Sequence, residues 1–312
     1  MNALVRVLTA IVALAVLAPA AQATLPGRNG EIGFVFSGAG GDTEPFVETI
    51  GLEAKVPGRQ RKRSLVECER TDGAPSGGDC RATKFSSPSY SPDGSRIVFD
   101  AGERIGLIGA GGAGLALLPS VSGDDGDPAF SPDGRRIVFT GANDRGTTDL
   151  YVHRLGSLFA RQIVNDASEP AWSSRNEIAY VRDGNVYVSN WKGNRRRFVV
   201  SGRSPDWSPG GGRLVFVRPL PNLTFEGAVG RVFTVGARGR GLQRVFPRVT
   251  DAFGPVWSPD SRWLAFARAE AGVFAKRLGS RRPAELIAET QISGESGSVA
   301  YFDPAWRPRP RR

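Results

Sequence analysis

The stretch that decides the fold is Pro128-Ala129-Phe130-Ser131-Pro132-Asp133-Gly134-Arg135-Arg136-Ile137-Val138-Phe139-Thr140. Proline fixes φ at one corner and glycine tolerates positive φ at another, so residues 131–134 predict a turn between two strands. After polar loops, residues 149–153 and 161–164 supply two further short strands. The stretch therefore predicts four antiparallel strands with no helix between them.

The phrase Pro-x-aromatic occurs six times, starting at residues 88, 128, 170, 205, 255 and 304. Repetition at a period of roughly 35–50 residues, with four strands in each period, is typical of a β-propeller. The aromatic residue holds the same place in every copy, which favours packing between blades over stacking on a ligand. We therefore predict an all-β fold, a six-bladed β-propeller of four-stranded antiparallel blades.

Two copies of the repeat, 90–99 and 130–139, resemble the WD40-like (PD40) repeat of TolB-type propellers. The resemblance covers nearly all of residues 24–312, although 173–176 and 208–212 depart from the usual turn. It implies a six-bladed propeller that binds partners in the cell envelope. TolB-type proteins also carry an N-terminal α/β domain, for which few residues remain ahead of the first predicted strand. The specific partners of TolB are therefore not carried over.

The two ends of the chain complement each other. Residues 30–36 read as a second strand without its own inner strand, whereas Asp303-Pro304-Ala305-Trp306 reads as an inner strand with nothing after it. Pairing them leaves fewer exposed sheet edges. We expect the C-terminal strand to close the ring against the N-terminal strands, in one domain of residues 24–312.

Residues 1–23 read as a signal peptide, with Arg6, an apolar run over 7–17 and Ala21-Gln22-Ala23 before the cleavage site. The alternative, a membrane anchor, needs about 20 apolar residues. Pro19 and Gln22 interrupt this run. We expect an exported protein that does not span a membrane after cleavage and is periplasmic, extracellular or associated with the cell envelope.

Cys68 and Cys80 are the two cysteines of the chain. In an exported protein, two cysteines around a Gly-rich loop favour a disulfide. A redox or metal pair is the alternative, but the spacing is longer than in such sites and no histidine accompanies it. We predict a structural disulfide between Cys68 and Cys80.

Acidic residues precede three of the repeated prolines: Asp127, Glu169 and Asp303. The six positions before the prolines would ring the mouth of the central channel, which makes these three candidate metal ligands. Ca²⁺ is the cation that carboxylates favour, but residues 124–127 lack the spacing of an EF-hand loop. For residues 124–127 we favour an inter-blade loop over a Ca²⁺ site, and we expect no other cofactor. His153, the single histidine, is expected on the surface of a strand.

The formal net charge is +10. Antiparallel topology places the first-to-second and third-to-fourth connections of each blade on one face, which we call the underside; the other connections form the upper face. The underside would carry these basic candidates: Arg61, Lys62, Arg63, Arg135, Arg136, Arg195, Arg196, Arg197, Arg238, Arg240, Arg281 and Arg282. They indicate either a solvated Arg-rich surface or a docking face for anionic lipid or envelope polymer. Export removes nucleic acid as the usual partner.

Two classes of function remain. The first is a non-catalytic, monomeric scaffold that binds a protein or an envelope component. The second is a propeller enzyme, a lyase or hydrolase acting on saccharide or lactone at the acidic channel mouth. Catalytic propellers concentrate His, Glu and Asp around the axis, often with a metal. With one histidine and no nucleophile elbow, the sequence favours the scaffold.

Overall fold

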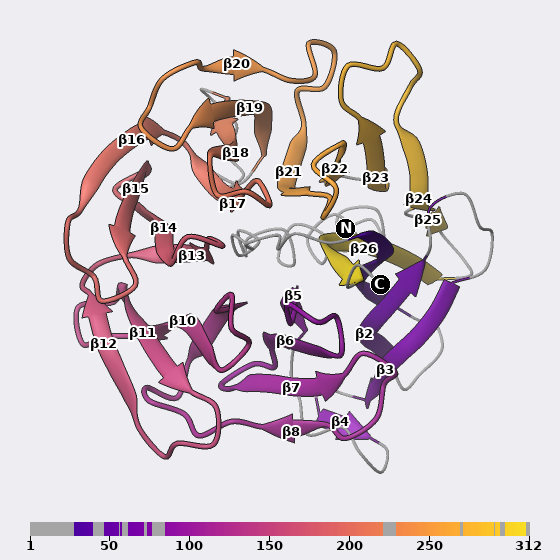
Figure 1. Ribbon diagram of the computed structural model, residues 1–312. Helices are drawn as coiled ribbons and strands as arrows, with labels where there is room; N and C mark the ends of the chain where they lie inside the picture. The colour runs from indigo at the N-terminus through magenta and orange to yellow at the C-terminus, as the bar shows by residue number, and fades with distance from the viewer. Residues whose placement is uncertain are drawn as a thin grey trace.

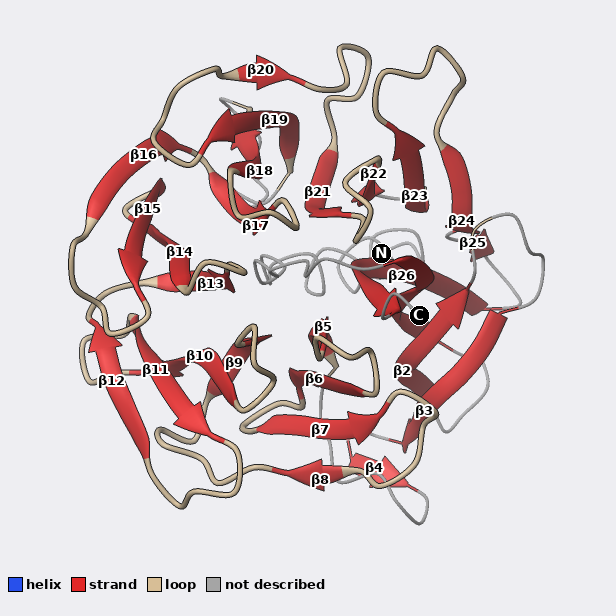
Figure 2. Cartoon of the chain, viewed as in Figure 1, coloured by secondary structure: helices blue, strands red, loops and turns tan. Residues whose placement is uncertain are grey.

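The computed structural model describes residues 28–39, 47–55, 57, 62–71, 74–76, 85–220, 229–268, 271–289, 291–293 and 297–309. These residues form strands and loops without a helix, as Figure 2 shows. Over this part of the chain, therefore, no helix has the length and hydropathy of a membrane span. The predicted signal peptide (1–23), Arg61 and Cys80 lie outside the described residues. The prediction of an all-β fold is confirmed for the part that is described.

The strands, in chain order, are β1 (Arg28–Ala39), β2 (Val47–Lys55), β3 (Lys62–Thr71), β4 (Ala74–Ser76), β5 (Ser86–Tyr90), β6 (Arg96–Asp100), β7 (Ile105–Gly109), β8 (Ala116–Leu117), β9 (Asp125–Phe130), β10 (Arg136–Ala142), β11 (Thr148–Arg154), β12 (Ala160–Val164), β13 (Ser168–Trp172), β14 (Glu177–Arg182), β15 (Asn185–Asn190), β16 (Arg197–Ser201), β17 (Arg203–Trp207), β18 (Arg213–Pro219), β19 (Gly230–Gly236), β20 (Gln243–Arg244), β21 (Ala252–Trp257), β22 (Trp263–Arg268), β23 (Gly272–Arg277), β24 (Glu285–Glu289), β25 (Gln291–Ser293) and β26 (Gly297–Arg309).

The sheets are antiparallel, and three of the five have the predicted four strands. β5–β8, β9–β12 and β13–β16 form three separate four-stranded sheets. A larger sheet contains two sets of strands, β17–β20 and β21–β24. A single residue pair, Gly230 with Ala252, joins the two sets. The remaining sheet has the order β25-β26-β1-β2-β3-β4.

Six strands contain the repeated phrase, namely β5, β9, β13, β17, β21 and β26, and they lie nearest the centre of the molecule in Figure 1. Each contacts the next in that order, and β26 also contacts β5. Their aromatic residues are all buried: Tyr90, Phe130, Trp172, Trp207, Trp257 and Trp306. The prediction that these rings pack in the core is therefore confirmed.

The C-terminal strand β26 pairs with the N-terminal strand β1, and Ile32 lies opposite Trp306 in that register. The Arg307 guanidinium reinforces the junction, because it contacts a Glu31 carboxylate oxygen at 2.8 Å and donates to the Gly94 carbonyl oxygen at 2.7 Å. Strands from the two ends of the sequence thus share one sheet.

The repeated serine after the aromatic residue starts a tight turn. Its carbonyl oxygen accepts a hydrogen bond from the residue three positions later, at 2.8 Å for Ser91 and 2.9 Å for Ser131. The two departing copies form the same turn, because Asn176 and Gly211 donate to Ser173 and Ser208. Asn176 also adopts the positive φ for which three other copies use glycine and one uses Ser261. Asparagine tolerates that conformation better than most residues.

Both kinds of underside connection lie side by side. Just after the third strand of a sheet, a backbone N–H donates to a carbonyl oxygen in the first-to-second turn. These pairs are Ala110 to Ser95, Leu155 to Arg135, Trp191 to Asn176, Ala237 to Gly212, and Leu278 to Arg262. The repeated bond brings the two connections together on the underside, as antiparallel topology predicts.

Candidate functional site

The residue before each repeated proline has the same unusual backbone conformation. Ser87, Asp127, Glu169, Ser204, Gly254 and Asp303 all have φ between 50° and 53°. In every inner strand the pairing register shifts at this point, which is the signature of a β-bulge. A residue before proline normally favours extended backbone. Positive φ at the five non-glycine positions therefore costs about 1 kcal/mol or more each.

The three acids at these positions contact neighbouring inner strands. An Asp303 carboxylate oxygen accepts from the Ser87 backbone N–H at 3.0 Å, and the Ser87 hydroxyl donates to Asp127 at 3.1 Å. The Glu169 carboxylate accepts from the Ser204 backbone N–H. Asp303 and Glu169 are buried, each 2% exposed. The structure thus places the candidate channel-mouth acids in contacts between adjacent strands.

Burial raises the pKa of Glu169, while the Ser204 N–H and the Arg203 guanidinium oppose that rise. Arg203 lies 3.6 Å from the Glu169 carboxylate. A carboxyl with a raised pKa in a cleft can serve as a general acid. Here the Glu169 carboxyl already serves as a hydrogen-bond acceptor between β13 and β17.

Sequence reasoning missed a further acid of this kind, Asp206. Its side chain is fully buried, and one carboxylate oxygen accepts from the backbone N–H of Trp257 on the next inner strand at 2.6 Å. A signal was present in the sequence. Asp206 occupies the middle position of Pro-x-aromatic, where the other five copies have Ser89, Ala129, Ala171, Val256 and Ala305.

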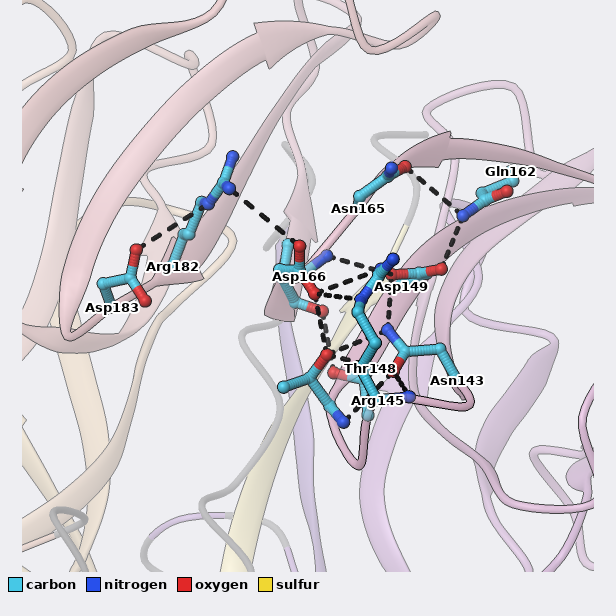
Figure 3. Close-up of polar contacts among 11 residues, drawn as sticks. Asn143, Arg145, Thr148, Asp149, Gln162, Asn165, Asp166, Arg182 and Asp183 are labelled. Atoms are coloured by element: carbon cyan, nitrogen blue, oxygen red, sulfur yellow. Dashed lines mark hydrogen bonds and ion pairs between the residues drawn. The ribbon is translucent and has the colours of Figure 1, made fainter.

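A polar network on the upper face, drawn in Figure 3, also went unpredicted. Asp149 is 4% exposed and accepts from Asn143 at 2.8 Å, from Gln162 at 2.5 Å and from the Asp166 backbone N–H at 2.9 Å. Asp166 accepts from the Thr147 hydroxyl at 2.8 Å and pairs with Arg145 at 3.1 Å. The Thr147 hydrogen bond is the main reason that the pKa of Asp166 is lowered. The network fixes the loops on either side of β11 and β12.

The acidic loop before β9 is also tied into the fold. Asp125 is buried and accepts from the Val121 backbone N–H at 3.0 Å and from the Ser122 hydroxyl at 2.8 Å. Asp124 is exposed. Among the described residues, no group of three or more His, Cys, Asp or Glu side chains is arranged to hold a metal ion.

The prediction that His153 lies on the surface is wrong. Its side chain is 3% exposed, and Nε2 has no hydrogen-bond partner within the described structure. Burial lowers the pKa of His153, and a hydrogen bond to the Phe159 backbone partly opposes this. Val152 and His153 point to opposite faces of β11 and both are buried, so neither face of this strand is open to solvent at that point.

A pH dependence of stability follows from His153. The unfolded chain binds the imidazole proton near pH 6.5, whereas the folded chain binds it only at lower pH. The contribution of the neutral His153 ring to the free energy of unfolding is therefore fully present above about pH 6.5. It is lost as the pH falls toward the lower pKa that the ring has in the folded protein. We expect urea denaturation between roughly pH 7.5 and 5 to show a smaller acid-induced loss for His153→Gln than for the natural protein. As the chain has a single histidine, equal losses would contradict this prediction.

The basic candidates of the underside fall into two groups. Arg196 donates to the Gly193 and Ile163 carbonyl oxygens at 2.7 Å and 3.1 Å, and Arg197 pairs with Glu177 at 2.9 Å. By contrast, Arg195, Arg281 and Arg282 are exposed. Lys62 and Arg63 belong to β3, but their side chains, like all of Arg61, lie outside the description. Arg196 is exposed as well, but its guanidinium already bonds two carbonyl oxygens, so Arg195, Arg281 and Arg282 are among the candidates available to a partner.

Comparison with solved structures identifies the fold. TolB from Acinetobacter baumannii is 14% identical, with a TM-score of 0.62 over 91% of this chain and 68% of that one. A putative TolB from Agrobacterium tumefaciens, also 14% identical, gives a TM-score of 0.57 over 88% and 99%. Hydrazine synthase from Kuenenia stuttgartiensis is 13% identical, with a TM-score of 0.64 over 91% and 48%. No family model matches the sequence. At this identity the likeness shows the fold alone, a TolB-like β-propeller.

Proposed function

We propose that this protein is an exported, non-catalytic propeller scaffold that binds an envelope component or a protein through its basic underside. The observation that carries the proposal is that the charged residues of the two faces differ in their contacts. The candidate acids Asp127, Glu169 and Asp303 contact neighbouring inner strands. The arginines Arg195, Arg281 and Arg282 extend from the underside into solvent. Only the second set is presented to a partner.

The finer architecture belongs to the same proposal. Residues 24–312 would form six blades from six PD40 repeats, after cleavage of a signal peptide at 1–23 and without a cofactor. Support comes from the six inner strands, which share the same bulge and contact one another in chain order. The pairing of β26 with β1 would close the ring. A Cys68–Cys80 disulfide would stabilise the outer part of the first blade, where Cys68 lies on β3.

The test uses two triple variants of the mature protein with equal loss of charge. In one, Arg195, Arg281 and Arg282 become serine; in the other, the exposed upper-face residues Arg104, Arg231 and Arg248 do. Each cation near an anionic surface contributes about 1 kcal/mol. We expect the underside variant to lose roughly tenfold or more of its cosedimentation with a cell-envelope fraction. The upper-face variant should behave as the natural protein.

Equal binding by both variants would contradict the proposal. A melting temperature that rises with millimolar Ca²⁺ and fails to rise after Asp127→Asn with Glu169→Gln would also contradict it. Such a result would support an enzyme, a lyase or hydrolase with its site at the channel mouth, because a ligand that binds only the folded state must stabilise it.

A further inference from the structure

The turn between β11 and β12 exposes two large apolar side chains in succession. Leu158 is 77% exposed and Phe159 is 82% exposed, whereas the next most exposed large hydrophobic residue, Phe198, is at 56%. The turn belongs to the underside because it connects a third to a fourth strand. A single exposed leucine is ordinary on a protein surface. Two adjacent apolar residues at the end of a hairpin require an explanation.

The hairpin end has a defined conformation. The Ser157 backbone N–H donates to the Arg154 carbonyl oxygen at 2.9 Å, and the Phe159 N–H donates to the Ser157 hydroxyl at 3.2 Å. The buried His153 ring also bonds to the Phe159 backbone. These bonds hold the backbone while Leu158 and Phe159 remain in solvent. Burying the Leu158 and Phe159 side chains in a partner would therefore cost little backbone conformational entropy, because the turn is already ordered.

Exposed cations flank the hairpin end. Arg154 and Arg161 flank it in sequence and are exposed, and the bond from Leu155 N–H to the Arg135 carbonyl brings in the exposed Arg135. Asp133, the acid of that adjoining turn, is paired with Arg136 at 3.0 Å. The local charge is therefore strongly positive.

The next sheet adds to this field. Arg196 donates to Ile163 on β12 and so fixes the 191–196 turn beside the hairpin. Within that turn, the half-buried Trp191 ring lies 5.2 Å from the Arg136 guanidinium carbon, 5.7 Å from that of Arg161 and 5.4 Å from Lys192 Nζ. Cations over an aromatic face are held by its quadrupole. Trp191 thus orders Arg136, Arg161 and Lys192 along the side of this hairpin.

We propose that this hairpin is a membrane-docking element: Leu158 and Phe159 enter the interfacial layer of an anionic lipid bilayer while the surrounding arginines contact phosphate headgroups. This inference rests on the proposed function and specifies the partner of the basic underside. Apolar insertion combined with basic side chains is the chemistry of peripheral membrane binding. A protein interface buries about 800 Å² on each side and has few charges in its core. Two exposed apolar side chains flanked by cations match a bilayer better.

The experiment is cosedimentation of the mature protein with vesicles of equimolar phosphatidylglycerol and phosphatidylcholine, and with vesicles of phosphatidylcholine alone. We expect binding to the anionic vesicles that weakens as salt is raised. Leu158→Ser with Phe159→Ser should lower the partition coefficient by about tenfold or more. The control, Val121→Ser, removes a 40% exposed apolar residue from the upper face and should leave binding unchanged. The Leu158/Phe159 variant should melt as the natural protein does, since both replaced side chains are largely exposed.

The outcomes separate this inference from the proposed function. If the Leu158/Phe159 variant binds anionic vesicles as the natural protein does, while the underside arginine variant does not, insertion is wrong and the basic docking face stands. If the natural protein binds the envelope fraction but no vesicle, the lipid partner is wrong and a polymer or protein takes its place. If the Leu158/Phe159 variant instead abolishes self-association in analytical ultracentrifugation, the hairpin is an interface between copies, and the inference is again wrong.

Discussion

Replacing Gly193 with alanine is expected to lower the free energy of unfolding by about 3 kcal/mol. Gly193 has φ of 81°, and a Cβ there would overlap the carbonyl oxygen of Ile163 on the neighbouring sheet. The substitution therefore combines the strain of a left-handed backbone conformation with a collision between the new Cβ and a backbone carbonyl. Ile163 cannot yield easily, because Arg196 also bonds its carbonyl oxygen. Urea denaturation followed by tryptophan fluorescence measures the loss.

Gly184→Ala is the matched control for Gly193→Ala. Gly184 lies in another turn of the same sheet with φ of 70°, and nothing lies within 4 Å of the Cβ it would gain. It should lose only the conformational part, about 1 kcal/mol. If the two variants were equally stable, the close approach of the sheets at Gly193 would not be a feature of the folded protein.

Replacing Asp206 with alanine is expected to cost about 3 kcal/mol. The variant leaves the Trp257 backbone N–H buried without the carboxylate that accepts from it at 2.6 Å. It also removes the contact between two inner strands, β17 and β21, at a place that water does not reach. Because the effect falls on a junction between repeats, we expect the variant to be cleaved faster by a protease under native conditions.

Two controls isolate the hydrogen bond at Asp206. Asp206→Asn retains an acceptor oxygen of the same shape and should lose clearly less stability than Asp206→Ala. Asp124→Ala removes an exposed carboxylate and should stay within about 0.5 kcal/mol of the natural protein. An alanine at 206 that is no more harmful than one at 124 would show that the junction does not depend on this acid.

Local patterns predicted much of the architecture because the repeat is read from neighbouring residues. Proline, glycine and serine mark each turn, and the aromatic residue two positions after each repeated proline marks an inner strand, so even the departing turns at Ser173 and Ser208 form as the others do. The pairing of β26 with β1 was also predicted, because each end of the chain lacked the strand that the other possessed.

The roles of the acidic and basic residues could not be predicted in the same way. Asp127, Glu169 and Asp303 occupy equivalent positions in the sequence, but whether their oxygens meet solvent or a neighbouring N–H depends on how adjacent strands are spaced. The same holds for Arg195 and Arg196, since only the second reaches a carbonyl on the next sheet. His153 is buried because both faces of β11 are covered, which an alternating pattern in the sequence does not reveal.

The sequence by itself thus determined the strands, their turns and the order in which they pair, because these depend on backbone preferences and on a periodic apolar pattern. Only the tertiary structure decided which charged groups are used within the protein and which are left for a partner. That decision depends on distances between residues on different strands and sheets, such as Glu169 and Ser204, which no local pattern encodes.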